Sequence, residues 1–152
     1  MKKLFLSMFG TGYAPFAPGT FGSLATLPLV FALSFCPYPL FVTLALVIVG
    51  TIFTSIWTEQ IQNEEGLHDP QWIVIDECLG MLTAWCFYLG NDIKSLLVIF
   101  LLFRFFDIIK FWPASYFDKK MQHGAGVILD DIVSGLYAGL LFLALKKVFL
   151  FS

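Results

Sequence analysis

The chain has 152 residues, of which 59% are hydrophobic and only 13% are charged, whereas ordinary soluble domains carry about 25% charged residues. Its net charge of −2 comes without a basic patch, which excludes a nucleic-acid-binding protein. Three cysteines without a C-x-x-C pair argue against a disulfide framework or a zinc site. The length suits one domain, which we expect to cover residues 1–152.

The first charge-free run extends from Leu4 to Thr58, and no soluble domain of this size needs such a run. It predicts a polytopic membrane protein. We expect an all-α fold, a membrane helix bundle whose charged site lies at one membrane face. The bundle should contain about five hydrophobic helices, at Phe21–Phe35, Leu40–Thr58, Trp72–Leu89, Ile93–Trp112 and Val127–Leu150.

The connections between these helices carry Pro, Gly and polar residues. The longest are a polar segment from Glu59 to Gln71 and a loop from Pro113 to Gly126. His68 and His123 fall in these two loops, where we expect exposed side chains. The N-terminus starts like a signal peptide, but its apolar stretch is too short, so we interpret it as mature sequence.

Five spans would place the two chain termini on opposite membrane faces. The N-terminal side would then carry five lysines and the other side three, which predicts a cytoplasmic N-terminus. The two sets are Lys2, Lys3, Lys110, Lys119 and Lys120 against Lys94, Lys146 and Lys147.

Seven charged residues interrupt the hydrophobic helices. Each would cost about 2.5–3.5 kcal/mol at mid-membrane on insertion scales, so such residues usually serve a function. Antiparallel threading of the third, fourth and fifth helices brings all of them to one membrane face. They are Asp76, Glu77, Arg104, Asp107, Lys110, Asp130 and Asp131.

The spacing of these charges indicates how they can cooperate. Arg104, Asp107 and Lys110 are three residues apart, so they line nearly one face of a helix. Each sequential acidic pair diverges by about 100°, so one member can face a metal while the other orients a ligand or water. Carboxylates without a histidine or cysteine pattern suit Mg²⁺, and adjacent Lys and Arg suit a phosphate group. The sequence therefore predicts metal-assisted phosphoryl chemistry.

The segment from Gly10 to Ser23 is rich in Gly, Pro and hydroxyl groups and precedes a helix. Free backbone N–H groups at a helix start attract anions, although the segment lacks the P-loop pattern. By itself, a turn or helix start of this composition is more often only structural.

At these residues the sequence resembles the phosphatidylglycerophosphatase A family of bacterial membrane phosphatases. Four blocks occur in the family's order and together extend from about Gly10 to Gly139. They are Gly12–Pro15 with Ala17–Ser23, Val74–Glu77 with Gly80, Phe103–Lys110, and Gly124–Asp131. The resemblance implies an all-helical hydrolase of phospholipid biosynthesis. Such an enzyme would hydrolyse phosphatidylglycerophosphate to phosphatidylglycerol and phosphate with Mg²⁺, in the bacterial inner (cytoplasmic) membrane. Because the charged residues lie on the N-terminal side of the membrane, the predicted cytoplasmic N-terminus places the site on the cytoplasmic face.

On this interpretation the charged residues take three overlapping roles. The catalytic residues would be Asp76, Glu77, Asp107, Asp130 and Asp131. The Mg²⁺ ligands would be Asp76, Glu77, Asp130 and Asp131. The residues that bind the phospholipid substrate would be Arg104, Lys110, Thr20 and Ser23. Either a carboxylate or a metal-bound water could attack phosphorus.

Two other functions are compatible with intramembrane carboxylates. A small ion- or proton-coupled transporter would place its charges near the bilayer midplane, often with an inverted repeat. An accessory subunit would use them to bind a partner helix. Neither function explains why a Gly-Thr-Phe-Gly-Ser segment would lie on the same face as the charges.

Overall fold

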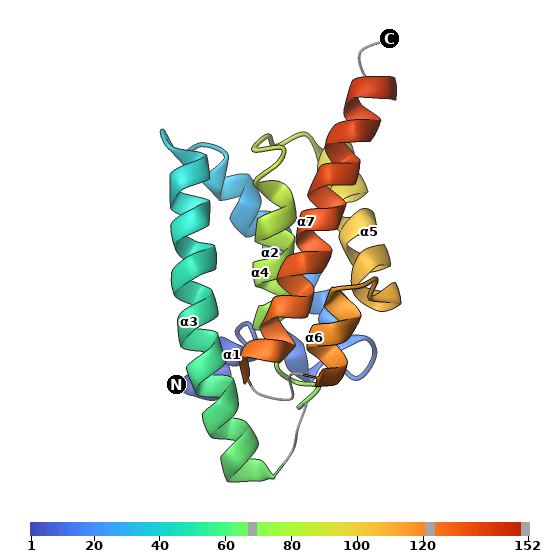
Figure 1. Cartoon of the computed structure of the whole chain (residues 1–152). Helices are drawn as coiled ribbons and strands as arrows, with labels where there is room; N and C mark the ends of the chain where they lie inside the picture. Colours follow the sequence, from blue (N-terminus) through green and yellow to red (C-terminus); the bar gives the residue numbers. More distant parts are fainter. Residues whose placement is uncertain (67–69, 121–123, 150–152) are drawn as a thin grey trace.

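The computed structural model describes residues 1–66, 70–120 and 124–149 (Figure 1). All of its regular elements are helices. In chain order they are α1 (Lys2–Leu6), the 3₁₀ helix η1 (Thr11–Tyr13), α2 (Pro18–Leu33), α3 (Pro39–Glu65), α4 (Ile75–Trp85), α5 (Ile93–Ile109), α6 (Ala114–Lys120) and α7 (Gly124–Phe149).

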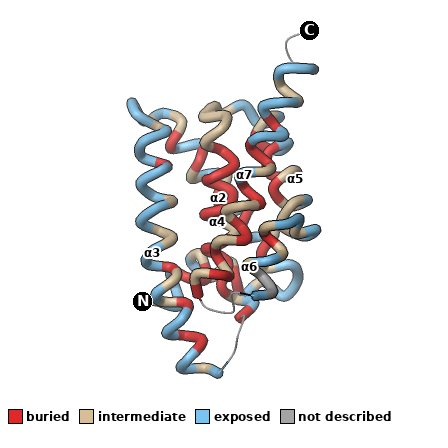
Figure 2. The backbone as a smooth tube through the Cα atoms, viewed as in Figure 1, coloured by how far each residue is buried: buried red, intermediate tan, exposed pale blue. Residues whose placement is uncertain are grey.

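Helix α4 is the centre of the bundle, with α2, α3, α5 and α7 around it (Figures 1 and 2). Every residue from Val74 to Trp85 is buried except the half-buried Glu77. Helix α3 lies at the outside and leaves most of its apolar side chains exposed (Figure 2). The chain thus has a protein-covered core helix and an apolar outer surface.

Close packing of α4 and α7 depends on two glycines. A methyl group at Gly135 would overlap the carbonyl oxygen of Gly80, and one at Gly80 would lie 2.7 Å from the carbonyl oxygen of Asp131. Because neither residue carries a side chain, the two backbones can approach closely. This contact fixes the second turn of α7, which carries Asp131, beside the first turns of α4.

Helix α3 is longer than the sequence predicted and α4 is shorter. The charged residues from Glu59 onward continue α3 instead of forming a loop, and the helix ends at Gly66, whose φ of 67° suits a left-handed cap. Helix α4 begins only after Val74, whose N–H donates to the carbonyl oxygen of Leu6 at 3.0 Å. It ends at Trp85, whose indole N–H donates to the carbonyl oxygen of Gly90 at 2.9 Å.

Two further differences lie after α5. This helix ends at Ile109, three residues before the predicted end, because Lys110 takes a left-handed conformation with φ 49°. The segment from Pro113, predicted as a loop, contains the short helix α6. The predicted bounds of α2 and α7 differ from the observed ones by only a few residues.

Among the residues that the structure describes, two helices are long and apolar enough to cross a membrane. The first is α3, whose most apolar stretch has a mean hydropathy of 2.3 and is 17% buried. The second is the stretch Gly124–Val148 of α7, whose most apolar part has a mean hydropathy of 1.8 and is 44% buried. The 11 residues of α4 would extend only about 16 Å, about half of a bilayer's hydrocarbon core.

Candidate active site

The first turn of α2, the first turn of α4, the last turn of α5 and the second turn of α7 lie at the same end of the bundle (Figure 1). Each of these turns carries residues that the sequence singled out. The antiparallel order of the helices therefore brings together side chains that are more than 100 residues apart in the chain.

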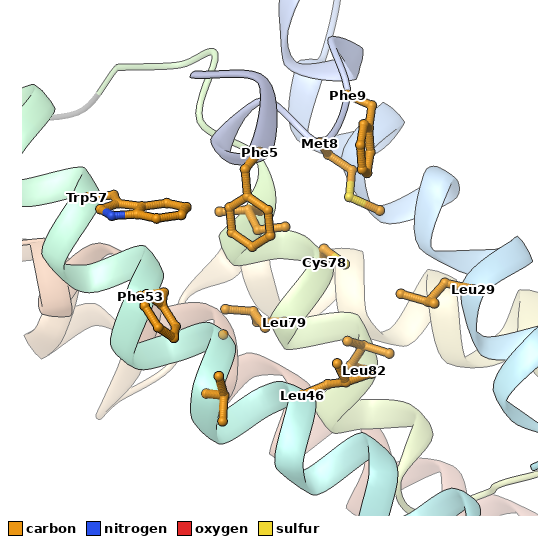
Figure 3. Close-up of a pocket in the computed structure, with 13 residues that line it drawn as sticks. Phe5, Met8, Phe9, Leu29, Leu46, Phe53, Trp57, Cys78, Leu79 and Leu82 are labelled. Atoms are coloured by element: carbon orange, nitrogen blue, oxygen red, sulfur yellow. The ribbon is translucent and has the colours of Figure 1, made fainter. Parts of the chain in front are cut away.

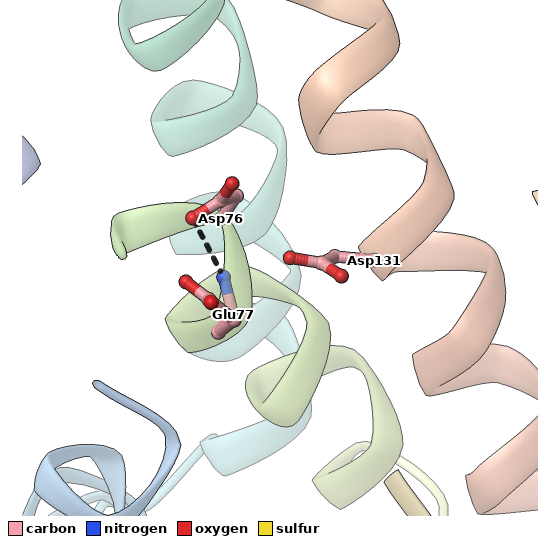
Figure 4. Close-up of side chains that lie close together, drawn as sticks. All are labelled: Asp76, Glu77 and Asp131. Carbon is pink, nitrogen blue, oxygen red and sulfur yellow. Dashed lines mark hydrogen bonds between the residues drawn. The ribbon is translucent and has the colours of Figure 1, made fainter. Parts of the chain in front are cut away.

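Three carboxylates form an acidic centre, defined by Asp76, Glu77 and Asp131 (Figure 4). One oxygen from each lies within 4.8 Å of the others. Asp76 and Asp131 are only 6% and 4% exposed, and Asp76 Oδ1 accepts a hydrogen bond from the Glu77 backbone N–H at 3.1 Å. Glu77 Oε2 is buried without a hydrogen-bond partner among the described residues, which leaves it free to meet a ligand.

Asp130 does not join the acidic centre. Its Oδ2 accepts a 2.6 Å hydrogen bond from Lys110 Nζ, so the two form an ion pair. The Asp130 side chain is 5% exposed and that of Lys110 is 31% exposed. The divergence expected of adjacent helical residues is therefore seen here, since Asp131 faces α4 while Asp130 faces Lys110.

Arg104 and Asp107 make the second ion pair, with Nη1 and Oδ2 2.5 Å apart. Arg104 Nη1 also lies 3.5 Å from the hydroxyl oxygen of Ser23, at the limit of a hydrogen bond. Ser23 in turn donates to the carbonyl oxygen of Gly19 at 2.8 Å. The start of α2 is thus tied to Arg104 of α5.

Gly19 lies directly against the charged side chains. A methyl group there would overlap Glu77 Oε1 and would lie 3.3 Å from Arg104 Nη1. Glu77 and Arg104 therefore pack against the same point of the α2 backbone. Thr20, the other predicted substrate residue of this segment, is half-buried, and its N–H donates to the carbonyl oxygen of Ala17 at 2.9 Å.

The electrostatic balance of the site points to a cation. Seven charged side chains meet here, and the two ion pairs account for both bases and two of the acids. The three carboxylates that remain are those of the acidic centre. Oxygen ligands at this density suit Mg²⁺ or a similar hard ion, and the unpartnered oxygen of Glu77 fits the same interpretation. The adjacent Lys110 and Arg104 suit a phosphate group.

Sequence reasoning found the charged residues but missed two of their contacts. It did not predict the pairing of Lys110 with Asp130, which depends on the turn after α5. It also missed Gly19 as the residue that packs on Glu77, although Gly19 belongs to one of the blocks that carry the resemblance. His68 and His123 lie outside the described residues.

Fold and site together define an all-helical protein in which a cluster of carboxylates suited to bind a cation is flanked by two basic residues, Arg104 and Lys110. The family model described as phosphatidylglycerophosphatase A matches residues 4–146. The chain belongs to this family.

Three curated relatives are similar over nearly the whole chain. The phosphatidylglycerophosphatase A of Escherichia coli K12 is 36% identical over 136 residues, which cover 88% of this chain and 77% of the relative. That of Haemophilus influenzae is 35% identical over 146 residues, covering 91% and 84%. A Bacteroides thetaiotaomicron protein named "Putative phosphatidylinositol-3-phosphatase" is 38% identical over 141 residues, covering 88% and 86%. No solved structure matches the chain.

Proposed function

We propose that this protein is a membrane phosphatase that hydrolyses phosphatidylglycerophosphate to phosphatidylglycerol and inorganic phosphate. The observation that carries the proposal is the acidic centre beside Lys110 and Arg104. It occurs in a chain that the family model matches from residue 4 to residue 146. The names of the Escherichia coli and Haemophilus influenzae relatives supply the substrate.

We infer that Asp76, Glu77 and Asp131 hold Mg²⁺, because their oxygens converge and one of them lacks a partner. The bound ion would supply Lewis-acid polarisation of a phosphoryl oxygen and would offset the excess negative charge. Asp130, which the sequence predicted as a fourth ligand, contacts Lys110 instead. Its role in this proposal is to hold that lysine beside the centre.

The two bases have different tasks in the proposed reaction. Lys110 is the more exposed, so it is the better placed to meet a phosphate that arrives from the membrane surface. Arg104 is held by Asp107 and Ser23 and would orient the groups around Glu77. Hydrolysis breaks the bond between phosphorus and the glycerol oxygen, and water supplies the hydroxyl of phosphate and the proton of the alcohol.

We propose a multi-pass location in the bacterial inner membrane, with the site on the cytoplasmic face. The exposed apolar surface of α3 and the length of α7 support it. The shortness of α4 is compatible with it, because neighbouring helices cover α4 and no lipid needs to solvate its ends. The substrate's acyl chains could then stay in the bilayer while its phosphate enters the charged end.

The test is phosphate release by the purified protein from phosphatidylglycerophosphate with Mg²⁺, with an EDTA-treated sample as control. Phosphatidylinositol 3-phosphate serves as a second substrate, because of the name of the Bacteroides relative. We expect rapid, EDTA-sensitive release from the first lipid and slower release from the second. Full activity in EDTA would contradict the metal assignment. If neither lipid releases phosphate, the phosphatase function is contradicted. That result would favour the transporter, which moves its substrate unchanged.

A further inference from the structure

A second feature of the chain lies on the other side of α4 from Glu77. It is an apolar groove of about 390 Å³ between the N-terminal segment and helices α2, α3 and α4 (Figure 3). None of the 13 lining residues is charged, and large side chains such as Phe5, Phe53 and Trp57 form its wall. Its size is that of a small-molecule site, and its lining suits a hydrocarbon ligand.

The groove follows the axis of α3 from Leu46 to Trp57. Eleven residues of helix correspond to about 16 Å. One leaflet of a bilayer has a hydrocarbon thickness of about 15 Å, half of the whole core. The groove therefore has the length of an acyl chain that lies along the helix within a single leaflet.

A positive charge lies just beyond one end of the groove. Phe5 and Trp57 make an edge contact there, with ring centroids 5.4 Å apart. About one turn further along both helices, Lys2 Nζ donates to the neutral Gln60 side chain at 2.6 Å. The next residue, Lys3, is paired with the carboxylate of Glu65. Lys2 thus keeps a charge that is available to an anionic group.

The groove is separate from the acidic centre. Ile75, Cys78, Leu79 and Leu82 line it and form one stripe of α4, at the spacing of a single helix face. Glu77 points away from this stripe. The N-terminal segment also lies across the start of α4, where Val74 N–H donates to the Leu6 carbonyl oxygen.

We propose that this groove is a second lipid site, which holds one acyl chain of an anionic phospholipid whose net negative head group lies against Lys2. The proposal rests on the membrane location proposed above. A chain in the groove would fill apolar space that the protein itself leaves open and would make van der Waals contacts with the lining. The bound lipid would also hold α1 in place through Phe5 and Lys2.

The test is the retention of phosphatidylserine and phosphatidylcholine with matched chains by the full-length protein in detergent, measured by native mass spectrometry. Phosphatidylserine is chosen because it is neither substrate nor product of the proposed reaction. Val49→Phe narrows the groove, and Lys2→Gln removes the charge. The matched controls are Val98→Phe, at an exposed valine of α5, and Lys94→Gln, at an exposed lysine of the opposite end.

We expect Val49→Phe to weaken both lipids at least about tenfold, as for an overfilled site. Lys2→Gln should weaken phosphatidylserine roughly fivefold, the size of an exposed ion pair, and leave phosphatidylcholine unchanged. Equal retention by all four variants, or equal affinity of the wild type for both lipids, would overturn the proposal. Phosphate release is measured on the same samples. A wild-type protein that retains neither lipid but hydrolyses its substrate normally counts against the groove alone, and one that retains lipid without hydrolysis counts against the phosphatase alone.

Discussion

The two ends of the bundle use charge in different ways. At the end opposite the acidic centre, Asp92 caps α5 by accepting from the Ser95 N–H at 2.9 Å, and its other oxygen contacts the Tyr88 hydroxyl. Lys146 Nζ lies 4.9 Å from the centre of the Tyr88 ring. These charges do the ordinary work of ending helices. At the acidic centre, by contrast, three converging carboxylates, two of them on buried residues and one on the half-buried Glu77, exceed what the fold needs, which is the pattern expected of a functional site.

The largest effect is expected from neutralising one carboxylate of the acidic centre, which tests whether the charges at this end serve function and those at the other end serve stability. Asp131→Asn should lower kcat by about 10³-fold, the upper size for losing one electrostatic partner of a transition state. The metal-free protein should at the same time become no less stable, because the substitution relieves repulsion among carboxylates. Turnover and thermal unfolding in EDTA measure the two effects. Near-normal turnover would show that the site lies elsewhere.

Asp76→Asn provides a matched second substitution within the same centre. It should show the same pairing of lost turnover with retained stability, because Asp76 and Asp131 are almost equally buried. A variant that loses both properties would indicate a structural role for that carboxylate.

A second prediction concerns the backbone against which Glu77 packs. Gly19→Ala should displace the Glu77 carboxylate, because the added methyl group overlaps Oε1. We expect Mn²⁺ binding, measured by electron paramagnetic resonance, to weaken about 10–100-fold, the usual effect of disturbing a ligand's surroundings. Adding Glu77→Asp should restore part of the affinity, since the shorter side chain makes room.

Gly50→Ala is the control for that experiment. It also presses on α4, but through the Leu79 side chain, 2.7 Å from the added methyl group and away from the carboxylates. It should leave metal binding unchanged. If both glycine variants lose metal equally, general loosening of α4 explains the effect and Gly19 has no special role.

A third prediction separates the two bases. Lys110→Ala should lower kcat/KM per folded molecule. The fall should correspond to a loss of about 2–3 kcal/mol of transition-state stabilisation, the size of a lost charge-assisted contact to phosphate. Arg104→Ala should mainly lower the yield of folded protein, because it strands the nearly buried Asp107 carboxylate.

Adding Asp107→Asn to Arg104→Ala should recover the yield. Lys110→Ala will also lose some yield, because its partner Asp130 is 5% exposed. Turnover is therefore compared only after normalisation to folded protein. A larger loss of normalised kcat/KM in the arginine variant would make Arg104 the phosphate ligand.

The smallest effect is expected at the opposite end. Backbone hydrogen bonding from Ser95 lowers the pKa of Asp92, so its capping contribution is present above the unfolded pKa near 3.9 and is lost as pH falls through the lower folded pKa. Asp92→Ala should cost about 1 kcal/mol of stability at pH 7. Thermal unfolding at pH 7 and pH 3 should show the difference from wild type shrinking in acid, with turnover unaffected at pH 7.

The sequence was sufficient to predict which charged residues meet, because antiparallel threading alone places Asp76, Asp107 and Asp131 at one end. It was not sufficient for the bounds of α4, which depend on a hydrogen bond from Val74 to a residue 68 positions earlier. The contact of Gly19 with Glu77 also requires three-dimensional packing. Hydrophobic residues from four elements line the groove, and no pattern in the sequence distinguishes them from the rest of an apolar chain.

The central position of α4 has a consequence for synthesis in the cell. Asp76 and Asp131 are 55 residues apart, so at about 5–20 residues per second Asp131 is made roughly 3–11 s after Asp76. Helix α5 is made within that interval, but α7 is not yet complete, so α4 lacks the cover of α7 and its two acids have no completed centre. A chain arrested before Gly124 should therefore be a substrate for membrane quality control, and the release of α7 should end that exposure.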